Sequence, residues 1–164
     1  MMNKLKTVLK VLLVILVVIQ FIRPKANNSY DNSNLITNKF ETPDNVMKSL
    51  QTSCFDCHSN GTVYPWYSKV QPVAWWLDDH INEGKREVNF SEFASYSPRR
   101  QFKKFTEIIN QIKENEMPLS SYTLIHQDAK LAQDQKDAII QWAKSCQEKM
   151  KLEYPIDSLQ KKKG

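Results

Sequence analysis

The pattern of apolar and polar positions divides the chain into an apolar N-terminal stretch, a polar segment and a series of amphipathic helices. Residues 8–22 are apolar except for Lys10 and Gln20, and residues 26–41 are polar and rich in asparagine. Beyond them, apolar residues recur at spacings of three and four, which predicts α-helices. We therefore predict an all-helical domain that follows an N-terminal helix and a polar linker.

The apolar stretch follows a basic start, which predicts an N-terminal signal anchor over residues 1–25. As a helix, its 15 residues would span about 22 Å, compared with about 30 Å for the hydrocarbon core of a bilayer. Counting from Leu5 lengthens the helix enough to span if the nearby lysines reach the headgroups. No small-x-small cleavage site follows Ile22, so an uncleaved transmembrane helix is favoured. The alternative is a cleaved signal that releases the protein into the periplasm.

Four main helices are predicted in a domain over residues 42–150, between the polar linker 26–41 and a charged C-terminal tail 151–164. Thr42-Pro43 and Ser97-Pro98 are typical of an N-cap followed by proline in the first turn. We expect the basic residues that open the third helix to form a solvated face. The four helices are a short one after Pro43 that ends near Cys54, then residues 72–86, residues 98–115, and one from about Gln133.

Composition and charge narrow the classes of function. The formal net charge is +5, but residues 1–25 hold five of the 23 basic residues and none of the 18 acidic ones. The rest of the chain therefore carries 18 charges of each sign, which does not indicate a nucleic-acid partner. The chain shows no nucleophile–base pair, paired carboxylates or phosphate-binding loop, so we expect an electron carrier or binding protein rather than an enzyme.

The motif at residues 54–58 reads Cys-Phe-Asp-Cys-His. Two thiols three positions apart, followed directly by an imidazole, are the attachment pattern of a c-type haem. Each sulfur adds across one vinyl group, and the histidine binds iron axially. Cys-x-x-Cys also occurs in zinc sites and thioredoxin-like centres. A zinc module would need His80 or His126 as a further ligand.

Met117-Pro118 follows the third predicted helix and supplies a candidate for the second iron ligand. A thioether held by the following proline favours ferrous iron and raises the reduction potential. His80, on the predicted apolar face of the helix over residues 72–86, is the alternative ligand. The aromatic residues predicted to form the haem pocket are Tyr64, Trp66, Tyr67, Trp76 and Trp142.

Several strings resemble the bacterial haem-binding domain family. They are Cys-Phe-Asp-Cys-His-Ser-Asn-Gly-Thr-Val-Tyr-Pro-Trp-Tyr-Ser at 54–68, Pro-Val-Ala-Trp-Trp at 72–76 with His80 and Gly84 after it, Asn-Phe-Ser-Glu-Phe at 89–93, and Glu-Met-Pro at 116–118. The resemblance covers about residues 42–147. It implies a cytochrome c-like domain with one covalent haem c at Cys54 and Cys57 and with His58 as iron ligand. Similarity to class I cytochromes c suggests Met117 as the other ligand and packing of the first helix on the last.

The leading hypothesis is a membrane-anchored monohaem protein that transfers single electrons. Resemblance to c-type cytochromes implies haem assembly on the outer face of the cytoplasmic membrane. The domain would then lie on the periplasmic side of a single-pass protein and meet a redox partner protein near the membrane. The alternative is a haem-based sensor or small-molecule binder in which Met117 is labile or absent from iron. Iron coordination discriminates between the two hypotheses.

Overall fold

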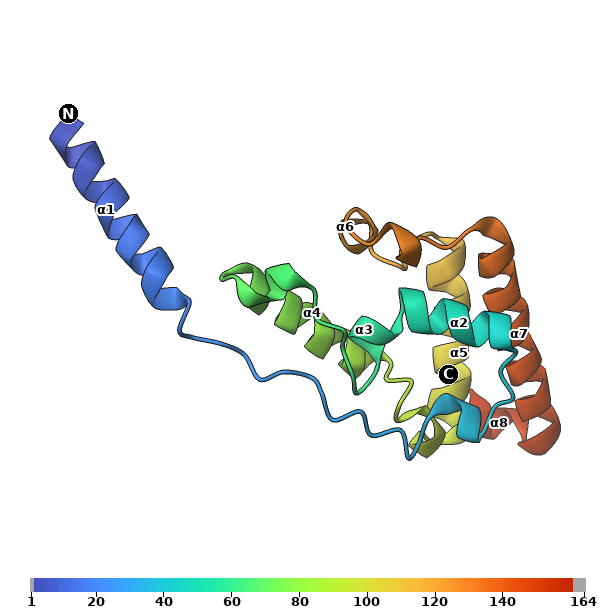
Figure 1. The fold of residues 1–164 in the computed structure, drawn as a ribbon. Coiled ribbons are helices and arrows are strands. Elements are labelled where there is room, and N and C mark those ends of the chain that lie inside the picture. The colour runs from blue at the N-terminus through green and yellow to red at the C-terminus, as the bar shows by residue number, and fades with distance from the viewer. Residues whose placement is uncertain (1, 161–164) are drawn as a thin grey trace.

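The computed structural model describes residues 2–160 and consists of helices joined by irregular segments (Figure 1). Its α-helices are α1 (Met2–Ile19), α2 (Asp44–Ser53), α3 (Phe55–His58), α4 (Val73–Glu87), α5 (Pro98–Lys113), α6 (Ser120–Thr123), α7 (Gln133–Glu153) and α8 (Ile156–Leu159). Short 3-10 helices are η1 (Ile36–Asn38), η2 (Trp66–Lys69), η3 (Phe93–Ser95) and η4 (Gln127–Ala129). Within residues 2–160 no strand forms, and one isolated antiparallel bridge joins Asn28 to Gly61. The all-helical class is confirmed, and the four main predicted helices correspond to α2, α4, α5 and α7.

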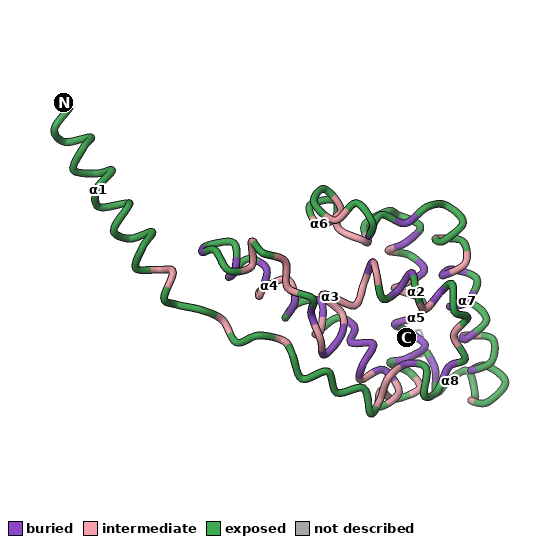
Figure 2. The backbone as a smooth tube through the Cα atoms, viewed as in Figure 1, coloured by how far each residue is buried: buried purple, intermediate pink, exposed green. Residues whose placement is uncertain are grey.

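The hydrophobic core lies where α2 and α5 pack against α7, with α8 added against α5. Phe105 is fully buried there and makes edge contacts with the rings of Phe40, at 4.9 Å, and Trp142, at 5.6 Å. Burying each such side chain contributes about 1.5–3 kcal/mol relative to leaving it exposed. Figure 2 shows buried backbone positions in these helices, in α4 and in the segment after α4, whereas α1 has none.

The starts of α2 and α5 differ in how the predicted caps are used. Ser97 caps α5 as expected, because its side chain accepts a hydrogen bond from the Arg100 N–H at 3.4 Å. At α2 the cap position is Pro43 instead of Thr42. The Thr42 hydroxyl donates to the Phe40 carbonyl at 2.9 Å, so it does not cap the helix.

Helix α4 has the predicted length, but only part of its predicted apolar face is buried. The apolar spacing places Val73, Trp76, Leu77, His80 and Ile81 on one face; Leu77 and Ile81 are buried, whereas Val73 and Trp76 are 37% and 47% exposed. The buried positions are Ala74, Leu77, Ile81 and Gly84. At Gly84 this face lies against α3, because the absent side chain allows the two backbones to approach closely.

The predicted N-terminal transmembrane helix is wrong. Among the residues that the structure describes, no helix is long and apolar enough to cross a membrane. Helix α1 carries Lys4, Lys6 and Lys10, which leave only residues 11–19 as an uninterrupted apolar run. Such a run spans about 14 Å as a helix, less than half of the roughly 30 Å that a bilayer core requires. The predicted single-pass location in the cytoplasmic membrane is therefore wrong as well.

Part of the predicted polar linker lies against the domain. Tyr30 donates its N–H to the Asn60 carbonyl, and Asn27 accepts from the Thr62 N–H, each at 3.0 Å. We call residues 27–32 the strap. It covers the loop that directly follows α3, and so fixes the backbone behind the Cys-x-x-Cys-His motif.

The predicted C-terminal tail is partly folded onto the domain. Helix α7 continues to Glu153, and Leu159 of α8 is only 2% exposed. The Arg99 side chain donates to the Asp157 and Ser158 carbonyls at 3.0 and 3.1 Å. Residues 161–164, with the predicted lysine cluster, lie outside the described residues.

Candidate functional site

A cavity of about 580 Å³ lies between α3 and α4 on one side and α5 with its following loop on the other. This volume falls within the roughly 300–1,000 Å³ typical of ligand and cofactor pockets. The lining residues that matter most for its chemistry are Cys54, Cys57, His58, His80, Lys104 and Met117. The structure therefore brings the motif and both predicted candidates for the second iron ligand to one cavity.

The motif occupies one tight turn at the end of α2. Cys54 is the single residue between α2 and α3, and its N–H bonds to the Leu50 carbonyl at 2.9 Å. The His58 N–H then bonds to the Cys54 carbonyl at 2.9 Å. This turn places Cys54, Cys57 and His58 side by side. Both thiols are free and half-buried.

The two thiols are protonated at neutral pH. Burial raises the pKa of Cys54 to about 12, and neighbouring Cys57 adds to the effect. Burial, followed by the charge of Asp56, raises the pKa of Cys57 to about 11. A thioredoxin-like centre needs a thiol with a lowered pKa, and zinc binds thiolates. The raised pKa values of Cys54 and Cys57 therefore favour neither a thioredoxin-like centre nor a zinc site.

The structure does not assemble the ligand set that the zinc alternative requires. Over residues 2–160, no group of three or more His, Cys, Asp and Glu side chains is arranged to hold a metal ion. His126 bonds instead to the Tyr67 hydroxyl, with 2.7 Å between Nε2 and Oη.

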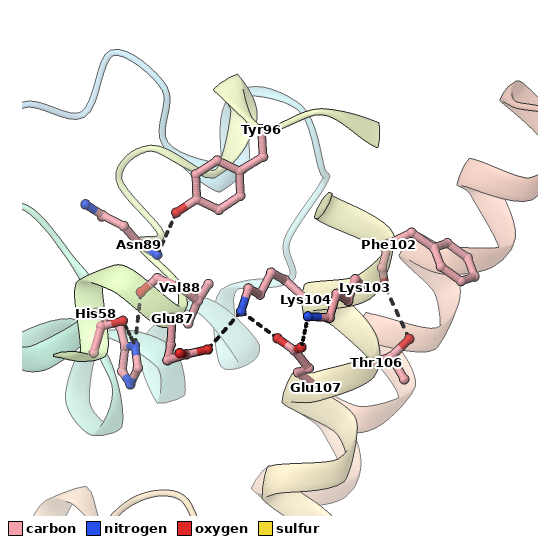
Figure 3. Close-up of polar contacts among 11 residues, drawn as sticks. His58, Glu87, Val88, Asn89, Tyr96, Phe102, Lys103, Lys104, Thr106 and Glu107 are labelled. Carbon is pink, nitrogen blue, oxygen red and sulfur yellow. Dashed lines mark hydrogen bonds and ion pairs between the residues drawn. The ribbon is translucent and has the colours of Figure 1, made fainter. Parts of the chain in front are cut away.

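His58 is oriented by two backbone carbonyls at the C-terminal end of α4. Its Nδ1 lies 2.9 Å from the Gly84 oxygen and 3.0 Å from the Val88 oxygen, and Figure 3 shows the bond to Val88. Carbonyl oxygens only accept, so Nδ1 carries the proton and Nε2 keeps its lone pair. Within residues 2–160, no hydrogen bond involves Nε2. Burial lowers the pKa of His58, against the opposing effect of the two carbonyls, and so favours the neutral ring that binds metals.

Gly84 makes this arrangement sterically possible. A Cβ atom at Gly84 would lie 2.7 Å from the Cys57 carbonyl oxygen, closer than real contacts. Its φ is negative, so the position requires space rather than glycine's conformational freedom. The absent side chain lets α4 approach α3 until the Gly84 carbonyl reaches His58. An isolated glycine within a helical pattern is a recognised sign of such packing, but the sequence alone did not identify its partner.

A chain of ion pairs joins the end of α4 to α5, and three of its members, Glu87, Lys104 and Glu107, line the cavity (Figure 3). Lys104, only 8% exposed, lies 3.1 Å from Glu87 and 2.6 Å from Glu107, and Lys103 lies 3.1 Å from Glu107. Burial opposes the charge of Lys104, but the hydrogen bonds and charges of Glu107 and Glu87 outweigh it and raise its pKa. Lys104 was expected on a solvated face. Lys104 can be buried because the carboxylates of Glu87 and Glu107 pair with its charge. The sequence alone did not identify these two partners.

Met117 and His80 remain the two candidates for the second iron ligand. Met117 is half-buried on the segment after α5, and its N–H donates to the Gln111 carbonyl at 3.3 Å. His80 lines the same cavity, but its Nδ1 bonds to the Trp76 carbonyl at 2.8 Å and its ring lies 4.2 Å from the Trp76 ring.

The aromatic residues predicted to form the pocket do not line the cavity. Trp66 is 79% exposed, and Trp142 is buried in the core, where its Nε1 donates to the Glu41 carbonyl at 3.1 Å. Phe90 is the aromatic residue that lines the cavity beside His58, with 6.3 Å between ring centroids. The predicted residues outside the lining are Tyr64, Trp66, Tyr67, Trp76 and Trp142.

Comparison with known proteins agrees with the position of this site. The family model of the haem-binding domain matches residues 14–145, a range that contains the motif, α4, α5 and Met117. No curated protein and no solved structure gives a significant match. Since the match covers most of the chain, this protein belongs to the haem-binding domain family.

Proposed function

We propose that the protein binds one haem c covalently through Cys54 and Cys57 and transfers single electrons. The observation that carries the proposal is the state of His58. Its Nδ1 lies within hydrogen-bond distance of two carbonyls, and no group of residues 2–160 bonds to its Nε2. The residue lines the same cavity as both thiols and Met117. Bound haem would supply a ferric/ferrous couple, which exchanges one electron at a time.

The two cysteines suit addition to vinyl groups. Cys54 and Cys57 would each form a carbon–sulfur bond to one vinyl group, and the thiol hydrogen would go to the neighbouring vinyl carbon as the double bond becomes single. No oxidant or reductant is consumed. The raised pKa values of Cys54 and Cys57 support this role, because thiols that stay protonated resist oxidation to a disulfide that would block attachment.

His58 and Met117 would be the two protein ligands that hold the haem iron. The carbonyls of Gly84 and Val88 hold the imidazole in one tautomer and one orientation, as is common for histidines that bind metals. A thioether from Met117 would raise the reduction potential. With both ligands bound, iron would have no site for a substrate, which favours an electron carrier over a catalyst.

A haem-based sensor is the second candidate function. The observation that favours it is that His58 and Met117, the two candidate iron ligands, are not held equally firmly. His58 is held by two side-chain hydrogen bonds, whereas no side-chain hydrogen bond involves Met117 within residues 2–160. The sixth position would then be the more easily vacated one.

The test is an absorption spectrum of the full chain matured with a c-type haem assembly system. We expect haem that stays attached after denaturation, together with the weak thioether-to-ferric-iron band at the red end of the visible spectrum. Met117→Ala should lose this band and lower the reduction potential. Met47→Ala, on α2 and outside the cavity, is the control and should change neither.

Two results would contradict parts of this proposal. Haem that is bound without the thioether band, in a protein that binds carbon monoxide readily, would favour the sensor. A matured protein without covalent haem would refute the attachment itself.

A further inference from the structure

Four side chains tie the segment that carries Met117 to the motif helix. The Tyr122 hydroxyl donates to Asp56 Oδ2 at 2.7 Å, and the rings of Tyr122 and His126 stack with 4.3 Å between centroids. His126 Nε2 in turn lies 2.7 Å from the Tyr67 hydroxyl. We call Asp56, Tyr67, Tyr122 and His126 the latch. Asp56 lies between the two cysteines of the motif, so the latch joins residues 117–126 directly to α3.

The latch provides the hydrogen bonds on one side of this segment. Met117 and Tyr122 both line the cavity, and the segment between them passes along its edge. On the α5 side, the Glu116 and Met117 N–H groups donate to the Gln111 carbonyl. Toward α3 and η2, the hydrogen bonds of residues 117–126 within the described chain are the two made by the latch.

Asp56 is itself firmly placed, so it can hold Tyr122 in position. Its other carboxylate oxygen accepts from the Val63 N–H at 3.0 Å, and its carbonyl accepts from the Thr62 hydroxyl at 2.6 Å. Hydrogen bonds to an ionised acceptor are stronger than those between neutral groups. Burial, with the bond to Asp56 second, raises the pKa of Tyr122, so the phenol remains a donor.

We propose that Tyr122 is a positioning residue that keeps Met117 on the haem iron. Its bond to Asp56 closes residues 117–126 against the motif helix, and opening this bond frees Met117 and exposes the sixth position to small ligands. The inference rests on the proposed function, because it assumes covalent haem with Met117 as a ligand. It assigns Asp56, Tyr67 and His126 a role in controlling access to iron.

The first test measures how fast carbon monoxide binds to the reduced, haem-loaded full chain. Tyr122→Phe keeps the ring and its stacking but removes the hydroxyl. We expect binding to become about tenfold faster, the low end of the effect of losing a hydrogen bond to a charged group. Tyr96→Phe is the matched control. It loses a 3.0 Å bond from the Asn89 N–H and does not touch the segment, so its rate should be that of the wild type.

Asp56→Asn separates the hydrogen bond from the charge. The asparagine oxygen can accept from the Val63 N–H while its amide donates to the Tyr122 oxygen, so both bonds persist. Because a neutral hydrogen bond is weaker than one to an ionised acceptor, we expect carbon monoxide to bind somewhat faster than in the wild type but clearly more slowly than in Tyr122→Phe. A rate as fast as that of Tyr122→Phe would show that charge, not the hydrogen bond, controls the segment, and would overturn the proposal.

Hydrogen exchange gives a readout that does not depend on iron chemistry. Amides of residues 117–126 should exchange faster in Tyr122→Phe than in the wild type or in Tyr96→Phe. Equal exchange and equal carbon monoxide rates would overturn the latch but leave covalent haem attachment intact. A wild-type protein without the thioether band would instead refute Met117 ligation, and the latch would fail with it.

Discussion

Replacing Gly84 with alanine perturbs the closest approach between α4 and the motif helix. The new Cβ would lie 2.7 Å from the Cys57 oxygen and 3.2 Å from the Cys57 carbonyl carbon. These are backbone atoms, so they cannot rotate away as a side chain could. Restoring an ordinary contact of 3.4 Å requires α3 and α4 to separate by about 0.7 Å.

The magnitude follows from the same displacement. If α3 moves by that amount, the bond from His58 Nδ1 to the Gly84 oxygen lengthens from 2.9 Å to about 3.6 Å, where it no longer counts as a hydrogen bond. Losing it costs about 1 kcal/mol, and overpacking costs about 1–3 kcal/mol. The higher helix propensity of alanine offsets about 1 kcal/mol of this destabilisation. The free energy of unfolding should therefore fall by about 1–3 kcal/mol.

The assay is guanidinium unfolding of the haem-loaded full chain, together with the yield of covalent haem. Asp79→Ala is the control, because Asp79 is exposed on the same helix and alanine there gains propensity without a new contact. We expect this control to match or slightly exceed the stability of the wild type, whereas Gly84→Ala loses both stability and haem yield. A Gly84→Ala protein as stable as the control, with undiminished haem, would refute the reasoning.

Two further predictions concern the thiols and the ion pairs. Acidified acetone should extract haem from the Cys54→Ala/Cys57→Ala double variant but not from Cys146→Ala, whose thiol is buried outside the cavity; extraction from both would refute covalent attachment. Burial raises the pKa of Glu107, but its bonds to Lys104 and a neighbouring lysine outweigh this and lower the pKa overall, so its charge stabilises the fold above about pH 4.5. The stability difference between the wild type and Glu107→Gln should shrink as the pH falls through that lowered pKa, and a difference that does not change with pH would contradict the assignment.

Local signals in the sequence predicted much of the fold. The Ser97-Pro98 cap, the periodic apolar positions of α5 and α7, and the loop position of Met117 depend on residues close together in the chain. The motif at 54–58 is equally local, and its three reactive side chains do line one cavity. The spacing of Cys54, Cys57 and His58 was therefore sufficient to locate the candidate site.

Contacts between distant segments accounted for most of the differences. The buried face of α4 is set by Gly84 against Cys57, 27 positions earlier in the chain, and no periodicity within α4 encodes that partner. Trp142 packs on Phe105 instead of the cavity, because the aromatic cluster of the core lies between α5 and α7. The latch likewise joins Asp56 to Tyr122, and neither residue marks the other in the sequence.

The strap bears on how the domain opens locally. None of residues 27–32 is buried, so the strap is held mainly by hydrogen bonds, whereas the core is held by apolar contacts. Segments with few buried apolar contacts open locally at lower free energies than the core. The strap should therefore detach at a lower free energy than α5 or α7 unfolds. Because α1 reaches the domain through the strap, the direction of α1 depends on one of the least stable parts of the fold.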